Sequence, residues 1–142
     1  MPPEQFEKFL ASGHKLHLAT VNTDGTPHLV SMFYAMVDGR IAFWTYRASQ
    51  KARNLARDPR VTCLVEDGDD YFELRGAQVT GEVRRIDDLA GVAEIGRLVA
   101  ARMAGQDAAV LDDYVAQAAA KRSAYLVEPR RVVSWDHRRL VG

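Results

Sequence analysis

The segment Trp44-Thr-Tyr-Arg-Ala-Ser-Gln-Lys-Ala-Arg-Asn-Leu55 contains the end of a predicted β-strand, a short turn and the start of an amphipathic helix. Apolar residues follow helical spacing at Ala48, Ala52, Leu55 and Ala56. Ser49 is a residue type preferred at a helix N-cap, and the residue before a proline avoids helical geometry. The segment therefore predicts a helix over residues 49–58 that ends at Asp58-Pro59.

Basic side chains gather where this predicted helix begins. Arg47, Lys51 and Arg53 surround its first turn, which carries no Asp or Glu. A helix N-terminus is partly positive, so each cation there costs about 0.3–1 kcal/mol. A bound anion, held also by backbone N–H groups, removes that cost. The pattern favours a phosphate site, while a solvated basic face that includes Arg57 is the alternative.

The composition limits the class of protein. A chain of 142 residues is long enough for one domain, which we expect to span residues 1–142. The 19 basic and 19 acidic residues give no net charge, which argues against a nucleic-acid partner. Cys63 is the single cysteine, in a strand-like segment that favours a buried, unreactive thiol. No stretch approaches 18 apolar residues, so we expect a cytoplasmic protein without a membrane partner.

Most of the chain is predicted to form strands. Thr23-Asp24-Gly25 and Asp38-Gly39 are typical hairpin turns between apolar segments. The predicted strands cover about residues 15–22, 26–37, 40–45, 61–66, 71–85 and 123–135, the last interrupted by Pro129. Further helices are predicted over about residues 4–12, from an N-cap at Asp87, and over about 107–121.

The first two predicted strands are apolar on both faces. Leu16 and Leu18 alternate with Ala19 and Val21, where a one-sided sheet would alternate apolar with polar residues. A barrel whose outer wall is covered by helices or by a second subunit explains this pattern. The fold class expected is therefore mainly β with helices, as a six-stranded β-barrel.

The sequence contains no recognisable motif for catalysis by protein side chains or by a bound metal. There is no catalytic triad pattern, no Cys-x-x-Cys, no glycine-rich phosphate loop and no metal-ligand spacing. The catalytic residues stay unassigned and no metal site is expected. Any reaction would then depend on a bound organic cofactor.

These residues resemble the flavin and deazaflavin oxidoreductases of split β-barrel fold, of which pyridoxamine 5′-phosphate oxidase is the best-known member. The resemblance extends from about Phe6 to Leu140, and it implies a six-stranded split β-barrel of the FMN-binding, oxidase-like type. Trp44-Thr45 matches an aromatic-Thr pair beside the ring system. Ser49-Gln50-Lys51 matches a Ser-Arg-Lys phosphate grip in which the arginine is replaced.

The same resemblance implies a role for each candidate residue. The implied cofactor-binding residues are His28, Val30, Ser31, Met32, Trp44, Thr45, Arg47, Ser49, Gln50, Lys51, Trp135 and Arg139. Ser49, Lys51 and the N–H groups of residues 50 and 51 would hold a phosphate, and Arg47 would steer an acidic tail. Residues 30–32 would run beneath the ring, and Trp135 and Arg139 would come from the second subunit of a homodimer.

Departures from the oxidase pattern point to a different branch. Gly76 stands where the oxidase has a flavin-contacting glutamine, whereas Lys51 to Arg60 and Ser134 to His137 resemble the deazaflavin-dependent proteins. The implied cofactor is coenzyme F420, used for hydride transfer to a small conjugated substrate. An FMN-dependent reductase and a non-catalytic cofactor carrier are the alternatives. Tyr34 and His28 are candidate proton donors, with structural roles equally open.

Overall fold

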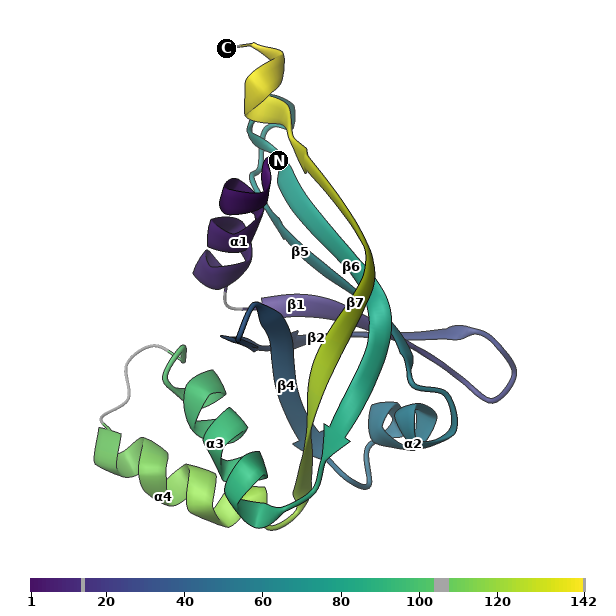
Figure 1. The fold of residues 1–142 in the computed structure, drawn as a ribbon, viewed down its shortest axis with the longest axis vertical. Helices are drawn as coiled ribbons and strands as arrows, with labels where there is room; N and C mark the ends of the chain where they lie inside the picture. Colours follow the sequence, from purple (N-terminus) through teal and green to yellow (C-terminus); the bar gives the residue numbers. More distant parts are fainter. Residues whose placement is uncertain (14, 104–107, 142) are drawn as a thin grey trace.

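The computed structural model describes residues 1–13, 15–103 and 108–141, which form one mainly antiparallel sheet with helices around it (Figure 1). The strands are β1 (Lys15–Val21), β2 (Pro27–Phe33), β3 (Ala35–Val37), β4 (Arg40–Tyr46), β5 (Arg60–Asp67), β6 (Arg75–Ile86) and β7 (Arg122–Asp136). The α-helices are α1 (Pro3–Ser12), α2 (Gln50–Arg57), α3 (Leu89–Ala100) and α4 (Ala108–Ala119). Two short 3-10 helices are η1 (Tyr71–Glu73) and η2 (His137–Leu140).

The sheet closes on itself as a half-barrel. Its strand order is β2-β1-β5-β6-β7-β4-β3, and all neighbouring strands are antiparallel. β2 and β3 lie at opposite ends of this order, although only Tyr34 separates them in the chain. The sheet must therefore curl to bring its two ends together, which confirms the predicted barrel-type fold.

The structure corrects three details of the predicted elements. The expected strand over residues 26–37 breaks at Tyr34, so seven strands replace six; the Tyr34 side chain is fully buried and its hydroxyl donates to the Leu10 carbonyl. Residues 71–73 form η1 rather than the start of a strand. Pro129 does not interrupt β7, because a register shift at Thr80/Gly81 of β6 accommodates it.

Helix starts follow capping chemistry, with one shift. Asp88, rather than the expected Asp87, caps α3 by accepting a hydrogen bond from the Gly91 N–H. Asp87 instead accepts hydrogen bonds from Ser123 and Arg85, which lowers the pKa of its carboxyl group. Two adjacent aspartates are equivalent in sequence, and their side-chain partners distinguish them.

Two hydrophobic cores lie on opposite faces of β4. Phe43 belongs to the core inside the half-barrel, together with Phe9 of α1 and Leu55 of α2. Trp44 belongs to a second core, where α3 and α4 cover β4 and β7. Figure 1 shows these two helices together beside β4, at the lower left. The helical cover explains the two-sided burial of this strand.

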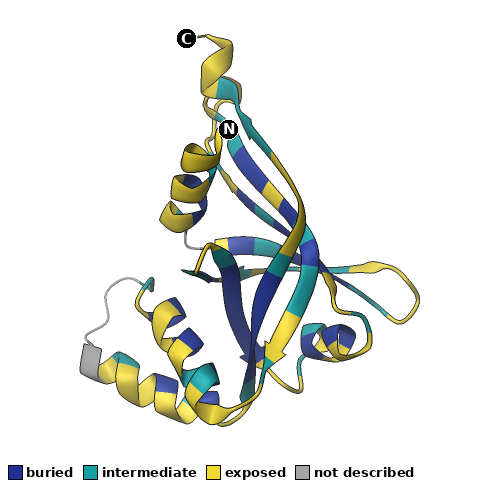
Figure 2. Ribbon diagram, in the orientation of Figure 1, coloured by how far each residue is buried: buried dark blue, intermediate teal, exposed yellow. Residues whose placement is uncertain are grey.

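The outer face of β2, β1, β5, β6 and the end of β7 is different. Among the described helices none covers it, and Figure 2 shows buried residues alternating with intermediate or exposed ones along β5 and the middle of β6. Leu29 is 66% exposed and Phe33 is 37% exposed on this side of β2. We call this surface the open sheet face. Its central outward row, matched by strand register, is Ser31, His17, Leu64, Gln78 and Val133.

Within the described part of the chain, no helix has the length and apolar character needed to cross a membrane.

Candidate cofactor site

The predicted anion site lies at the start of α2, directly after β4. Ser49 is the N-cap, and its Oγ accepts a hydrogen bond from the Ala52 N–H at 3.2 Å. Thr45 at the end of β4 is buried and its Oγ1 lies 3.3 Å from Ser49 Oγ. The first turn contains no acidic residue, so the N–H groups of Gln50 and Lys51 face no carboxylate of their own turn. This geometry retains the anion-binding character that the sequence indicated.

Lys51 is a half-buried cation in this first turn. It shares a helix face with buried Leu55, one turn further along α2. Burial lowers the pKa of its ammonium group. Within the described residues, the structure gives this ammonium neither a hydrogen bond nor an ion pair. A cation that has lost part of its water without gaining a counter-charge raises the energy of the protein, and a bound anion would compensate.

A buried polar cluster holds α2 in place. Asn54 is fully buried and donates from Nδ2 to Thr20 Oγ1 at 3.0 Å and to Asn22 Oδ1 at 2.9 Å. Its Oδ1 accepts from Gln50 Nε2 at 2.8 Å. The Gln50 side chain is therefore turned along the helix toward Asn54, which leaves only its backbone N–H pointing out of the N-terminus.

The arginines near α2 have carbonyl partners. Arg47 donates to the carbonyl oxygens of Ala120 at 2.6 Å and Arg122 at 3.1 Å, which ties the β4 end to the connection before β7. Arg53 donates to the Ala48 carbonyl at 2.7 Å and so stays beside the first turn of α2. Both add positive charge near the site, but Arg47 is engaged by the backbone of a distant segment.

The aromatic-Thr pair is split between the two faces of β4. Thr45 shares a face with Phe43, toward the half-barrel interior, whereas the Trp44 ring packs in the helical core. A Cβ added to Gly96 of α3 would overlap the Trp44 ring, so the indole packs directly against the backbone of that helix. Arg122 stacks on the same indole, 4.7 Å from its centroid.

The β2 candidates also divide by strand alternation. His28, Val30 and Met32 point inward, and the last two pack against the half-barrel core. His28 Nδ1 is buried and has no hydrogen-bond partner among the described residues. Ser31 points outward, onto the open sheet face. Among the described strands β2 pairs with β1 alone, so its other edge presents backbone groups that no described strand pairs.

The end of β7 and η2, which contain Trp135 and Arg139, lie near the C-terminus, far from α2 (Figure 1). Trp135 is opposite Gly76 in the β6–β7 pair and belongs to the open sheet face. Arg139, in η2, donates to Gln5 Oε1 at 2.6 Å. Within one chain, these two residues are thus apart from the α2 group of Thr45, Ser49, Gln50 and Lys51.

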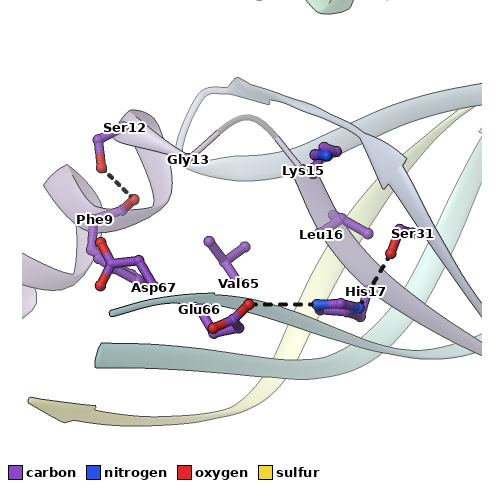
Figure 3. Close-up of a pocket in the computed structure, with 10 residues that line it drawn as sticks. All are labelled: Phe9, Ser12, Gly13, Lys15, Leu16, His17, Ser31, Val65, Glu66 and Asp67. Carbon is purple, nitrogen blue, oxygen red and sulfur yellow. Dashed lines mark hydrogen bonds and ion pairs between the residues drawn. The ribbon is translucent and has the colours of Figure 1, made fainter. Parts of the chain in front are cut away.

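The structure adds a polar cluster that sequence spacing did not identify. A cavity of about 430 Å³ opens where β1 and β5 diverge, beyond the last paired residues His17 and Leu64 (Figure 3). Ser31 Oγ lies 3.4 Å from His17 Nδ1, and Glu66 Oε1 lies 3.9 Å from His17 Nε2. The hairpin turn at residues 22–26 sets the Ser31–His17 pairing and could have predicted it. The approach of Glu66 depends on the β1–β5 pairing, which local sequence does not reveal.

The Tyr34 hydroxyl and the Cys63 thiol are both buried, and neither ionises readily at neutral pH. Burial raises the pKa of Tyr34 to about 12, and its hydroxyl is engaged by the Leu10 carbonyl. Cys63 is 1% exposed, and burial raises the pKa of its thiol to about 12. The predicted unreactive cysteine is confirmed, and Tyr34 has the structural role that the sequence left open.

Comparisons with known proteins agree with this architecture. A family model described as pyridoxamine 5'-phosphate oxidase matches residues 2–136. No curated protein matches the sequence. Among solved structures, a conserved hypothetical protein from Mycobacterium tuberculosis is similar, with 39% identity over 99% of this chain and 88% of that chain and a TM-score of 0.91.

Two further structures have names that describe a cofactor. An F420 reductase has 28% identity over 92% of this chain and 98% of that chain, with a TM-score of 0.70. A FAD-binding protein from Mesorhizobium loti has 19% identity, covers 94% of each chain and gives a TM-score of 0.69, which is a likeness of fold.

Proposed function

Since the chain belongs to the pyridoxamine 5'-phosphate oxidase family, we propose that it is an oxidoreductase that binds the deazaflavin coenzyme F420. When bound, this cofactor supplies a hydride, and the substrate is a small conjugated molecule that accepts it. The residues of the protein bind and orient the two reactants, because hydride transfer needs the reacting atoms about 3–3.5 Å apart. The 28% identity to an F420 reductase supports this choice of cofactor.

The observation that carries the proposal is the ammonium of Lys51, which has no hydrogen bond or ion pair within the described residues. Its half-buried position and its lowered pKa are the properties of a cation that a bound anion would stabilise. A cofactor phosphate would accept hydrogen bonds from Lys51, from the Ser49 hydroxyl and from the first-turn N–H groups of α2. Arg53, held beside the same turn, adds favourable charge for the acidic tail of F420.

The ring system of the cofactor would lie beside β2. The unpaired edge of β2 at residues 30–32 offers backbone donors and acceptors to a flat heterocycle. The buried Nδ1 of His28, which has no partner among the described residues, is a further group that a ligand could satisfy. Thr45 would contact the cofactor from the inner face of β4. Trp44, packed against α3, would support this wall from behind.

We further propose a twofold homodimer that pairs the open sheet faces. Leu29 and Phe33 expose apolar surface there, and a second copy would cover it. Trp135 and Arg139 would then reach the α2 site of the partner, which one chain alone does not allow. Light scattering at micromolar concentration should give a dimer mass, and a monomer would contradict the proposal.

The test of the anion site replaces Lys51 by methionine, which keeps most of the apolar side chain and removes the charge. Loss of a hydrogen bond to a charged group costs about 1.5–3 kcal/mol, so F420 affinity should fall about ten- to hundredfold. The free energy of unfolding should stay equal or rise, because a desolvated cation is removed. The matched control is Lys8→Met, at an exposed position of α1, which should change neither quantity.

The cofactor itself is tested by fluorescence titration of the protein with oxidised F420 and with FMN. Tighter binding of FMN would favour an FMN-dependent reductase on the same fold. Tight F420 binding without oxidation of the reduced cofactor by any enone, quinone or tetrapyrrole would favour a carrier. Equal F420 affinity of the wild type and Lys51→Met would show that the phosphate lies elsewhere.

A further inference from the structure

We propose that Lys51 is an acylation site: an acyl phosphate binds at the start of α2 and transfers its acyl group to the Lys51 amine. An acyl phosphate joins an anionic phosphoryl group to a carbonyl carbon that amines attack. The inference rests on the proposed function in one respect, because the acylated side chain would lose the charge that holds the cofactor phosphate. Acylation would therefore regulate occupancy of the cofactor site.

The Lys51 amine differs from the other lysine amines. Among the four lysines, all of which lie in the described residues, Lys8, Lys15 and Lys121 are exposed and Lys51 is half-buried. Burial lowers the pKa of its ammonium group, so a larger fraction of this amine is neutral and nucleophilic. No ion pair in the described part of the chain holds it in the charged form. We therefore expect Lys51 to be the most nucleophilic lysine.

The phosphoryl group and the amine meet at the same end of α2. The first turn of this helix has no acidic residue, and the N–H groups of residues 50 and 51 have no acceptor within the helix. The N-cap Ser49 adds a hydroxyl, which lies 3.3 Å from the hydroxyl of buried Thr45. Because helical side chains lean toward the helix N-terminus, we expect the Lys51 amine to lie near this turn.

The surroundings favour an anion and leave room for it to enter. Arg53 donates to the Ala48 carbonyl at 2.7 Å, which keeps its positive charge beside the first turn. α2 packs on the half-barrel core through Leu55, whereas the proposed dimer pairs the open sheet faces. The proposed function requires that a whole cofactor reach this site, so a smaller acyl phosphate can reach it too.

The transfer is balanced in atoms and charge. The neutral Nζ of Lys51 attacks the carbonyl carbon, and an N–C bond forms as the C–O bond to the phosphoryl group breaks. The leaving phosphate keeps the electron pair of that bond and takes the proton that the nitrogen loses, so it departs as hydrogen phosphate. The first-turn N–H groups and the Ser49 hydroxyl stabilise the charge that develops on the leaving oxygen. Holding both reactants in one site also avoids a bimolecular encounter.

The first test needs no cofactor. The protein is incubated with acetyl phosphate, and mass spectrometry of its peptides gives the acetylation rate of each lysine. Lys51 should react about tenfold faster or more than each exposed lysine, the factor expected for one hydrogen bond to a charged group. Inorganic phosphate should slow Lys51 and leave the exposed lysines unchanged. Equal rates at all four lysines, or no protection by inorganic phosphate, would overturn the proposal.

A neutral acyl donor separates phosphoryl recognition from nucleophilicity alone. 4-Nitrophenyl acetate carries no phosphoryl group, so its preference for Lys51 over the exposed lysines should be smaller than that of acetyl phosphate. An equal preference with both donors would mean that the start of α2 does not recognise the phosphoryl group, and would overturn the proposal.

A pair of variants tests the start of α2. Ser49→Asp keeps a residue type that caps helices and places a carboxylate where the phosphoryl group would bind. It should remove the preference of acetyl phosphate for Lys51. Ser49→Asn also caps helices but adds no charge, so it is the matched control and should keep the preference. Equal acetylation of Lys51 by acetyl phosphate in the two variants would contradict the site.

The consequence for the cofactor is tested last. Saturating F420 should protect Lys51 from acetyl phosphate, and the acetylated protein should bind F420 about ten- to hundredfold more weakly, as expected for Lys51→Met. Protection by inorganic phosphate without protection by F420 would count against the proposed cofactor site. The acylation site would then still stand on the rates measured without cofactor.

Discussion

The indole of Trp135 lies directly across the backbone of Gly76. The two residues face each other in the β6–β7 pair, and a Cβ placed on Gly76 would overlap the Cζ2 and Cε2 atoms of the ring. Because Gly76 has no side chain, the Trp135 ring can pack against its backbone at the end of the open sheet face. The position matched to the flavin-contacting glutamine of the oxidase is thus filled by an indole of the same chain.

Gly76→Ala should displace Trp135 and destabilise the fold. The added methyl group overlaps a ring held by two strands, and such overpacking costs about 1–3 kcal/mol. In a Trp44→Phe background Trp135 is the remaining tryptophan, so its fluorescence emission should shift to longer wavelength. Gln78→Ala, at an exposed position of the same strand, is the control. Unchanged emission in Gly76→Ala would contradict the packing described.

Asn54→Ala should loosen α2. The substitution removes the donor to Thr20, a buried hydroxyl, and the acceptor for Gln50. Leaving buried polar groups without partners costs about 1–3 kcal/mol, which chemical denaturation can measure. Asn22→Ala removes one bond of the same cluster at a half-buried position and should cost less. An equal loss in both variants would show that Asn54 has no special role in anchoring the helix.

Cys63 should resist thiol reagents while the protein is folded. Its thiol is buried between β-strands and its pKa is raised to about 12 by burial, so little thiolate forms at neutral pH. Labelling by iodoacetamide at pH 8 should be slow in buffer and fast in denaturant. Mass spectrometry gives both rates, and rapid labelling in buffer would mean that β5 opens readily.

Acid should destabilise the C-terminal end through Asp136. Hydrogen bonds from the Arg138 side chain and backbone N–H lower the pKa of this carboxyl from 3.8 to about 2. A carboxyl with a lower pKa in the folded protein contributes stability that is complete above 3.8 and is lost as the pH falls toward 2.

Asp136→Asn should therefore weaken the dependence of the unfolding free energy on pH between about 4 and 2, measured by urea denaturation. Arg138→Ala keeps the backbone N–H donor and should give an intermediate slope. A slope in Asp136→Asn equal to that of the wild type would assign the acid sensitivity to other carboxyl groups.

The local features of α2 were readable from the sequence, because they depend on neighbours in the chain. Ser49 caps the helix as predicted, the helix ends before Asp58-Pro59, and its first turn lacks acids. The Asp-Gly hairpins and the barrel-type sheet were also predictable, since turn chemistry and two-sided apolar patterns act over short distances. The break at Tyr34 was not, because it depends on a carbonyl of α1.

The amino-acid sequence alone determined the family resemblance, the approximate positions of most strands and the charge at the start of α2. Tertiary structure decided which way each side chain faces: Trp44 toward α3, Arg47 toward the carbonyls before β7, and Ser31 toward His17. The reason is that strand pairing and the curl of the sheet bring together residues far apart in the chain. Periodicity shows that a strand has two faces, but only the packed fold assigns a neighbour to each.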